Sequence, residues 1–138
     1  MKKKPRSLRS QCLDAVQKLS RLKAADEYGM VQCVSCNAHL RWNVAHGGHY
    51  IAKGSSSYWA LDERNVHPQC VPCNIFGMSR GSAEGQYTLW MIDYYGKDFV
   101  EEMHRDKRNI TKFYAQDYRD MLADFNEQIK IHLERLGE

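Results

Sequence analysis

Four cysteines arranged in two Cys-x-x-Cys pairs are the residues whose types and spacing most clearly predict chemistry. The pairs are Cys33-Val34-Ser35-Cys36 and Cys70-Val71-Pro72-Cys73, with 33 residues between them. One such pair places two thiolates on one ion, and two pairs complete the tetrahedral ligand set of a structural zinc ion. We therefore expect a structural zinc ion bound by Cys33, Cys36, Cys70 and Cys73.

The interval between the pairs contains the histidine-rich turn Ala45-His46-Gly47-Gly48-His49-Tyr50, and the second pair runs directly into Asn74. A zinc ion at the cysteines would fix Asn74 relative to His49. Hydrolysis of a phosphodiester needs a base that activates water and a Lewis acid at the phosphate. His49 is the candidate base, because an unperturbed imidazole titrates near pH ~6.5. Asn74 is the candidate magnesium ligand through its carbonyl oxygen.

Asn65 and His67 lie two residues apart, so on a strand they would face the same side. We expect Asn65 to fix the loop and to orient His49 by hydrogen bonding. His67 is expected to complete the catalytic metal site or to contact a phosphate. Asp62 and His46 are the alternative ligands, since one asparagine alone is a poor site for Mg²⁺ or Mn²⁺.

Short strands and a helix are expected to position these residues. The middle of the chain predicts a strand, a loop, a strand and a helix, with His49 ending the first strand and Asn74 on the helix. Residues 8–26 predict a helix at the start of the chain, because apolar residues recur there at helical spacing. A helix from about Glu84 to Tyr95 and a further turn or two over 97–106 are expected to follow the core.

The last predicted helix has an apolar stripe from Tyr118 to Leu136. This stripe is longer than a chain of this size obviously needs for its own core. We expect it to supply much of the interface of a homodimer.

Length and composition indicate one domain, since the chain has 138 residues, of which 43% are hydrophobic and 27% charged. Its expected parts are a basic helical arm (1–28), a zinc-bound core (29–83) and a helical C-terminal region (84–138). No apolar run approaches the roughly 18 residues of a membrane span, and the basic N-terminus leads into no apolar segment. A cytoplasmic protein with no membrane contact is therefore expected, and reduced cysteines there favour metal binding over disulfides.

The formal net charge of +3 is distributed unevenly. Residues 1–23 carry eight Lys or Arg and one acid, whereas residues 84–138 carry twelve acids and eight bases. A basic arm favours a partner with a phosphate backbone, and a solvated helix with a lysine tail is the alternative. The candidate DNA contacts are Lys2, Lys3, Lys4, Arg6 and Arg9 in the arm, and Arg41, Lys53, Arg64 and Arg80 around the core. Trp42, Tyr58 and Trp59 are candidates to stack on unpaired bases, with core packing as the alternative for at least two of them.

The string Asp62-Glu63-Arg64-Asn65-Val66-His67-Pro68-Gln69-Cys70-Val71-Pro72-Cys73-Asn74, preceded by Gly48-His49-Tyr50, resembles the HNH nuclease motif. More narrowly, about residues 31–105 are similar to the lambda-type phage recombination family NinG, also called Rap, including Tyr94-Tyr95-Gly96. The resemblance implies an α+β fold with a zinc-stabilised ββα-metal core (HNH, or His-Me finger) and flanking N- and C-terminal helices. It also implies an endonuclease that cuts branched recombination intermediates, such as Holliday junctions and D-loops, with magnesium or manganese.

Gly48 departs from this pattern, because many HNH proteins have Asp or His there as a metal ligand. Two alternative functions share part of the constellation. A general double-strand HNH endonuclease would use the same centre and ignore branching. A non-catalytic zinc-ribbon DNA-binding module would need the cysteines but not His49 or Asn74. A recombinase partner fits the resemblance, but no residue identifies it.

Overall fold

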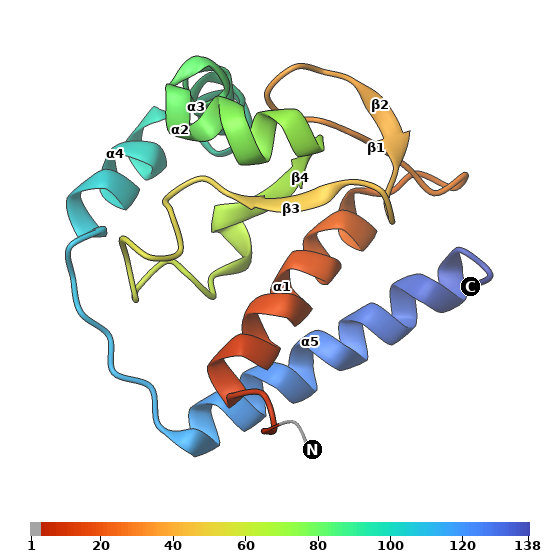
Figure 1. Ribbon diagram of the computed structural model, residues 1–138, viewed down its shortest axis with the longest axis vertical. Coiled ribbons are helices and arrows are strands. Elements are labelled where there is room, and N and C mark those ends of the chain that lie inside the picture. Colours follow the sequence, from red (N-terminus) through yellow and green to blue (C-terminus); the bar gives the residue numbers. More distant parts are fainter. Residues whose placement is uncertain (1–3) are drawn as a thin grey trace.

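Helices surround two small sheets in the computed structural model, which describes residues 4–138 (Figure 1). Within that range the α-helices are α1 (Leu8–Ala24), α2 (Met78–Arg80), α3 (Ser82–Tyr95), α4 (Lys97–Asp106) and α5 (Ala115–Arg135). The strands are β1 (Met30–Gln32), β2 (His39–Arg41), β3 (His46–His49) and β4 (Val66–Gln69). A 3-10 helix, η1 (Glu63–Asn65), precedes β4, and a π-helical turn, η2 (Cys73–Gly77), follows it. The expected mixed α+β class is confirmed, while the candidate DNA contacts Lys2 and Lys3 lie outside the described residues.

Both sheets are antiparallel pairs. β1 pairs with β2, and β3 pairs with β4 in a register that joins His46 to Gln69 and His49 to Val66. α1 packs directly on β3. The space between them is so small that a Cβ atom at Gly47 would lie 2.5 Å from the backbone oxygen of Gln17. Gly47 thus allows a helix to approach the strand that carries His49.

α1 begins where the sequence predicts and ends two residues earlier. Ser7 caps its start, since its hydroxyl accepts a hydrogen bond from Ser10 N at 3.1 Å. At the other end, Arg135 Nη2 donates to the carbonyl oxygens of Leu22 and Ala25, both at 3.0 Å. Arg135 thus adds a side-chain donor to the carbonyl groups at the end of α1, one of which, Leu22 O, also accepts from Ala25 N at 3.2 Å.

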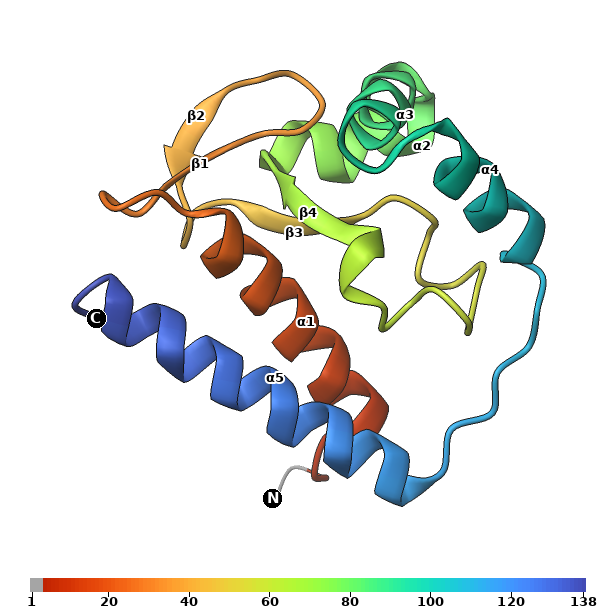
Figure 2. The same ribbon diagram turned by 180° about the vertical axis from the view of Figure 1, so that it is seen from behind.

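α5 lies alongside α1 and runs in the same direction (Figure 1, Figure 2). Cys12 Sγ lies 3.2 Å from Tyr118 O near the starts of the two helices, and Arg135 contacts α1 near their ends. Phe125 and Ile129 are buried in this contact, together with partly buried residues of the same stripe. The apolar stripe of α5 is therefore covered by α1 of the same chain, which removes the surface argument for an α5-mediated dimer.

The β3–β4 pair lies between two clusters of buried side chains. One is formed mainly by α1 and α5 with Val66 of β4, and the other by α3 and α4 with Tyr50, Ile51 and Trp59. α3 ends at Gly96, whose φ of 92° suits glycine, and α4 follows at once as a full helix. In the described part of the chain, no helix has both the length and the apolar character needed to cross a membrane.

Candidate functional site

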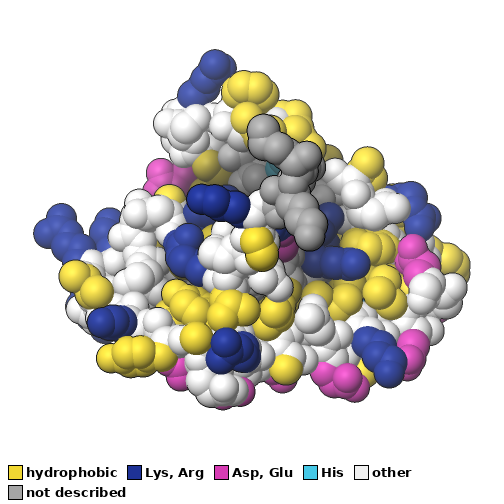
Figure 3. All heavy atoms as spheres, turned by 60° about the horizontal axis from the view of Figure 1, so that its bottom comes forward, with side chains coloured by type: hydrophobic (Ala, Val, Ile, Leu, Met, Phe, Trp, Pro, Cys, Tyr) yellow, Lys and Arg dark blue, Asp and Glu magenta, His cyan; other side chains and the backbone are white. Residues whose placement is uncertain are grey.

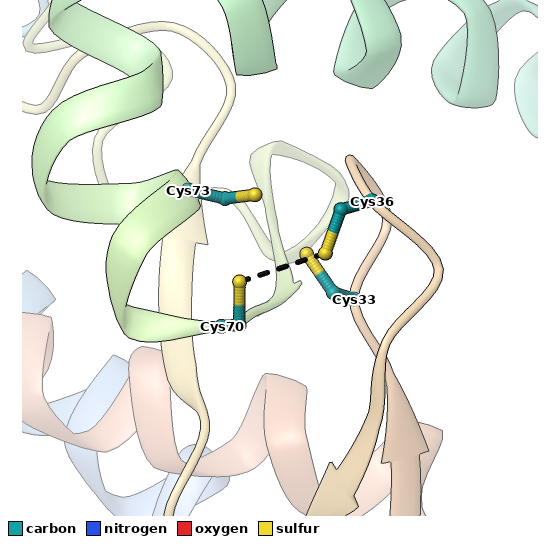
Figure 4. Close-up of side chains that lie close together, drawn as sticks. All are labelled: Cys33, Cys36, Cys70 and Cys73. Atoms are coloured by element: carbon teal, nitrogen blue, oxygen red, sulfur yellow. Dashed lines mark hydrogen bonds between the residues drawn. The ribbon is translucent and has the colours of Figure 1, made fainter.

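The four cysteine thiols face one another where the turn between β1 and β2 meets the end of β4 (Figure 4). Their sulfur atoms all lie within 4.8 Å of one another, and Cys36 Sγ is 3.6 Å from Cys70 Sγ. Four sulfurs at about 2.3 Å from one zinc ion are roughly 3.8 Å apart. The cluster therefore fits one tetrahedral ion and could hold zinc.

Burial and backbone N–H groups act in opposite directions on these thiols. Burial opposes ionisation of Cys33, but the N–H groups of Cys36, Cys70 and Ser35 outweigh it and lower the pKa of Cys33. Burial raises the pKa of Cys70 and the pKa of Cys73, and negative charge at Cys33 raises both further. A divalent cation removes this conflict, because its ligands bind as thiolates. The chemistry of the donor set thus also fits a metal ion.

Asn65 is fully buried and joins the two ends of the loop between β3 and β4. Its Oδ1 accepts a hydrogen bond from Ile51 N at 2.8 Å. Its Nδ2 donates to the carbonyl oxygens of Ile51 at 2.9 Å and Trp59 at 3.1 Å. These three bonds fix the path of the loop from one strand to the other.

His49 stands at the end of β3 and is partly buried. Its Nε2 lies 2.8 Å from the carbonyl oxygen of Ala60, the residue after Trp59 in the loop that Asn65 fixes. Because a carbonyl oxygen only accepts, Nε2 carries the proton and Nδ1 keeps its lone pair. Burial lowers the pKa of His49 against the opposing effect of the Ala60 bond, and the charges of Lys53 and Arg9 lower it further. His49 is thus held as a neutral imidazole.

Asn74 lies in η2, directly after the second cysteine pair, and contacts His46 at the start of β3. Asn74 Nδ2 is 2.9 Å from His46 Nδ1. The two side chains share the lining of a hollow of about 320 Å³ with Gln17, Arg21 and Lys53. The structure therefore brings Asn74 together with His46.

His67 has different neighbours. Its Nδ1 is 2.9 Å from Tyr87 Oη, and its Nε2 is 2.8 Å from Tyr95 Oη. Burial, with a smaller effect of Lys23, lowers the pKa of His67 to about 3. The shared strand face that the sequence suggested for Asn65 and His67 does not exist, since Asn65 ends η1 and only His67 lies in β4. His67 thus packs against α3 with both ring nitrogens occupied, and the structure does not place it with Asn74.

Asp62 forms an ion pair with Arg64, two residues further along the chain. Its carboxylate pairs with the Arg64 guanidinium at 2.8 Å and caps η1 by accepting from Arg64 N at 2.9 Å. Arg64 also lies over the rings of Trp59 and Phe99, at 5.3 and 4.9 Å from their centroids. Both residues thus have partners in the chain that account for their positions.

Gly48 has a packing reason to be glycine. A Cβ atom there would overlap the side chain of Gln69, which is fully buried on the neighbouring strand. Gln69 Nε2 donates to Ser35 Oγ at 2.9 Å, next to the cysteine cluster. An Asp or His ligand at position 48 would therefore displace the residue that links β4 to the first Cys-x-x-Cys turn.

The candidate DNA contacts are spread over the surface. Arg9 Nη2 donates to Lys53 O at 3.3 Å, so these two lie together beside His49. Arg6 pairs with Asp14, and Arg80 lies over the ring of Phe76 at 5.6 Å. Lys4 and Arg41 are exposed. Figure 3, which turns the starts of α1 and α5 forward, shows Lys and Arg side chains set among apolar ones on that side.

Several residues near these sites have positions that the sequence analysis did not settle. Arg21 lines the hollow and donates to Ala45 O at 3.1 Å, although the sequence analysis gave it no role. Trp42 and Trp59 are buried, so core packing accounts for both. Tyr58 is 40% exposed, and Tyr94 on α3 is 67% exposed. The Tyr94-Tyr95-Gly96 string was the only signal for Tyr94.

Fold and site together define a protein of mixed α+β fold built around a four-cysteine cluster that could bind zinc. The family model described as bacteriophage lambda NinG protein matches residues 1–135, and the chain belongs to the NinG family. It is 27% identical over 100 residues to Protein ninG of Escherichia phage 933W, and 25% identical over 100 residues to Protein ninG of Escherichia phage lambda.

Each of these two matches covers 71% of this chain and 46% of the relative. Protein ninG of Salmonella phage P22 is 26% identical over the same length. The chain thus spans about half the length of the curated relatives it matches. No solved structure matches the chain significantly.

Proposed function

We propose that the chain is a metal-dependent endonuclease of the HNH, or His-Me finger, type that cuts branched DNA. The observation that carries the proposal is the placement of His49, whose Nε2 is bonded to Ala60 O so that Nδ1 is the free acceptor. His49 ends the first strand of a β3–loop–β4–η2 unit, and Asn74 lies in the helical turn. This order supports a ββα-metal core with a structural zinc at the cysteines.

His49 Nδ1 is the atom that would take a proton from the attacking water. A general base has to be neutral at the working pH, and burial together with Lys53 and Arg9 favours the neutral form. The bond to Ala60 fixes the ring, and Asn65 in turn fixes the loop that carries this carbonyl. Asn65 therefore acts as a positioning residue for the base.

His46 and Asn74 are the residues that would hold a magnesium or manganese ion. Adjacent ligand atoms of an octahedral ion at about 2.1 Å are roughly 3.0 Å apart, and the Asn74 amide lies 2.9 Å from His46 Nδ1. Asn74 would face the ion with its amide oxygen, the alternative orientation of the same side chain. A bound divalent ion supplies a Lewis acid at the phosphate. Among the ligands considered from the sequence, the contacts favour His46 over His67 and Asp62.

Positive side chains surround the hollow that contains His46 and Asn74. Arg21 and Lys53 line it, and Arg9 contacts the backbone of Lys53. Phosphate contacts of this kind fix the position of DNA on a protein without reading its sequence. They support a DNA backbone at the hollow, with the scissile phosphate close to His49.

The decisive experiment compares cleavage of a four-way junction with cleavage of a linear duplex of the same sequence, with and without magnesium or manganese. We expect metal-dependent cuts near the branch, and His46→Ala and Asn74→Ala should each reduce the rate. Equal cleavage rates on the junction and the linear duplex would support the general double-strand nuclease. DNA binding with no cleavage under any metal would support the zinc-ribbon module instead.

Resolution of a junction by two symmetric cuts also leads us to propose a homodimer on DNA. Because α1 covers the apolar stripe of α5, such an interface would use a surface other than that stripe. Light scattering with and without junction DNA distinguishes one 16.1 kDa chain from two.

A further inference from the structure

A second cavity lies beside β4, between that strand, α1, α3 and the first Cys-x-x-Cys turn. Its volume is about 330 Å³, at the lower end of the roughly 300–1,000 Å³ usual for ligand pockets. His67, Trp90, Tyr94 and Tyr95 contribute to its lining, while the hollow with His46 and Asn74 is lined by residues of β3. The two cavities therefore have separate sets of lining residues.

The α3 side of the cavity is a wall of flat aromatic rings. Trp90 and Tyr94 are stacked, with an interplanar angle of 9° and 5.0 Å between ring centroids. Tyr94 is 67% exposed, so part of its ring is accessible from solvent. Aromatic rings of this kind accept the flat face of any nucleobase, because every base presents a π surface.

The His67 side of the cavity is uncharged and has little capacity for an anion. The His67 ring lies 4.5 Å from Trp90, and its two nitrogens are occupied by Tyr87 and Tyr95. Burying a charged group in such surroundings is costly, whereas a flat uncharged ring is not. A phosphate is therefore a poor occupant of the interior.

The rim is polar and includes a positive charge. Lys23 and Glu63 line the cavity, are partly exposed, and form an ion pair with 2.9 Å between Nζ and Oε1. Gln32 and Asn37 add side-chain amides, which can donate to and accept from the edge of a base. This arrangement provides groups that can form hydrogen bonds to the edge of a flat ring in the cavity.

We infer that this cavity binds an unpaired nucleobase of branched or single-stranded DNA, stacked on the exposed ring of Tyr94 on α3. The inference rests on the proposed function in one respect, namely that DNA is the substrate. It assigns the Tyr94 region to recognition of the branch, separately from the hydrolysis at His49. Paired duplex DNA offers no free base, so the cavity would favour DNA with unpaired positions.

The test measures binding of the full chain to two fluorescent DNAs by anisotropy, without added magnesium or manganese. One is a duplex with a short single-stranded arm, and the other is a blunt duplex. We expect the parent to prefer the armed DNA and Tyr94→Ala to weaken that binding by roughly 5- to 150-fold, the range expected for one base stacked on an aromatic ring. Tyr94→Phe keeps the ring and should restore most of the binding.

Two controls separate stacking from charge and from folding. Tyr114→Ala removes a tyrosine that is 63% exposed at the start of α5, far from α3 in Figure 1, and should bind like the parent. An arm with abasic sites keeps every phosphate but lacks the rings. It should weaken binding by the parent to the level of Tyr94→Ala and should weaken Tyr94→Ala no further.

The inference is overturned if Tyr94→Ala binds the armed DNA as the parent does, or if abasic arms bind as well as normal ones. Its failure is distinguishable from that of the nuclease. If the chain never cuts DNA but binds it in a Tyr94-dependent way, the base pocket is supported and the proposed catalysis is not. If cleavage depends on His49 and Tyr94→Ala has the same preference for branched DNA as the parent, catalysis is supported and the base pocket is not.

Discussion

His49 and His67 stand on neighbouring strands of one hairpin, yet their surroundings differ in the property that decides their chemistry. His49 Nε2 donates a hydrogen bond to a backbone carbonyl, and its Nδ1 has no hydrogen-bond partner among residues 4–138. Lys53 and Arg9 lie nearby. Both ring nitrogens of His67 are hydrogen-bonded to tyrosine hydroxyls of α3, and the ring packs against Trp90. The comparison shows that a histidine in a motif becomes a candidate base only when packing leaves one nitrogen available.

The largest expected effect comes from removing what both regions share, the cysteine cluster. Elemental analysis of protein purified without added metal should find about one zinc per chain. Cys33→Ser or chelation should unfold the chain, because structural zinc contributes on the order of 10–16 kcal/mol in small domains. Circular dichroism during titration with a chelator would follow the loss. A zinc-free chain with an unchanged spectrum would refute the scaffold role of the cluster.

The next effect is catalytic and confined to the His49 region. His49→Ala should lower the cleavage rate by roughly 10²- to 10⁴-fold, the usual cost of losing a general base, while zinc content and DNA binding stay intact. His39→Ala is the matched control, since His39 is an exposed histidine on β2. Parent-like cleavage by His49→Ala would show that another group activates the water.

A smaller effect concerns pH and separates His67 from His49. Burial lowers the pKa of His67 to about 3 in the folded chain, below the value of about 6.5 in an unfolded one. The unfolded state thus binds the extra proton between these values, so the free energy of unfolding falls as pH falls through this range. The slope for this one group approaches about 1.4 kcal/mol per pH unit.

Urea unfolding of parent and His67→Gln at pH 5 and pH 7 measures this contribution directly. The variant should lose less stability between the two pH values than the parent, because glutamine does not titrate. Equal losses would mean that His67 has an ordinary pKa in the folded chain. The lowered pKa of His49 would show in the cleavage rate instead. That rate should increase with pH and reach its plateau at a pH below about 6.5, the value for an ordinary imidazole.

Much of the architecture follows from local sequence patterns. The cysteine spacing predicted a four-sulfur cluster, and the apolar spacing of residues 8–26 predicted α1 to within two residues at its end. The break at Gly96 between α3 and α4 was also predictable, because glycine readily adopts the positive φ found there. These features depend on residues that are close in the chain or that meet at one ion.

What the sequence did not predict depends on contacts between distant segments. Strand alternation assigns His67 a face, but it does not show that the tyrosines of α3 pack on that face. Similarly, the stripe of α5 showed that the helix has an apolar partner, but not that α1 is this partner. The pairing of Asn74 with His46 likewise arises from the folded position of η2 beside the start of β3.

The side-by-side packing of α1 and α5 has a consequence for how the chain is made. Cys12 and Tyr118 are 106 residues apart, and Arg135 and Leu22 are 113 apart. At about 5–20 residues per second on the ribosome, α1 emerges roughly 5–20 s before α5 is synthesised. Until then the buried face of α1 lacks its main cover, so the nascent chain exposes an apolar helix face that α5 covers only once it has been translated.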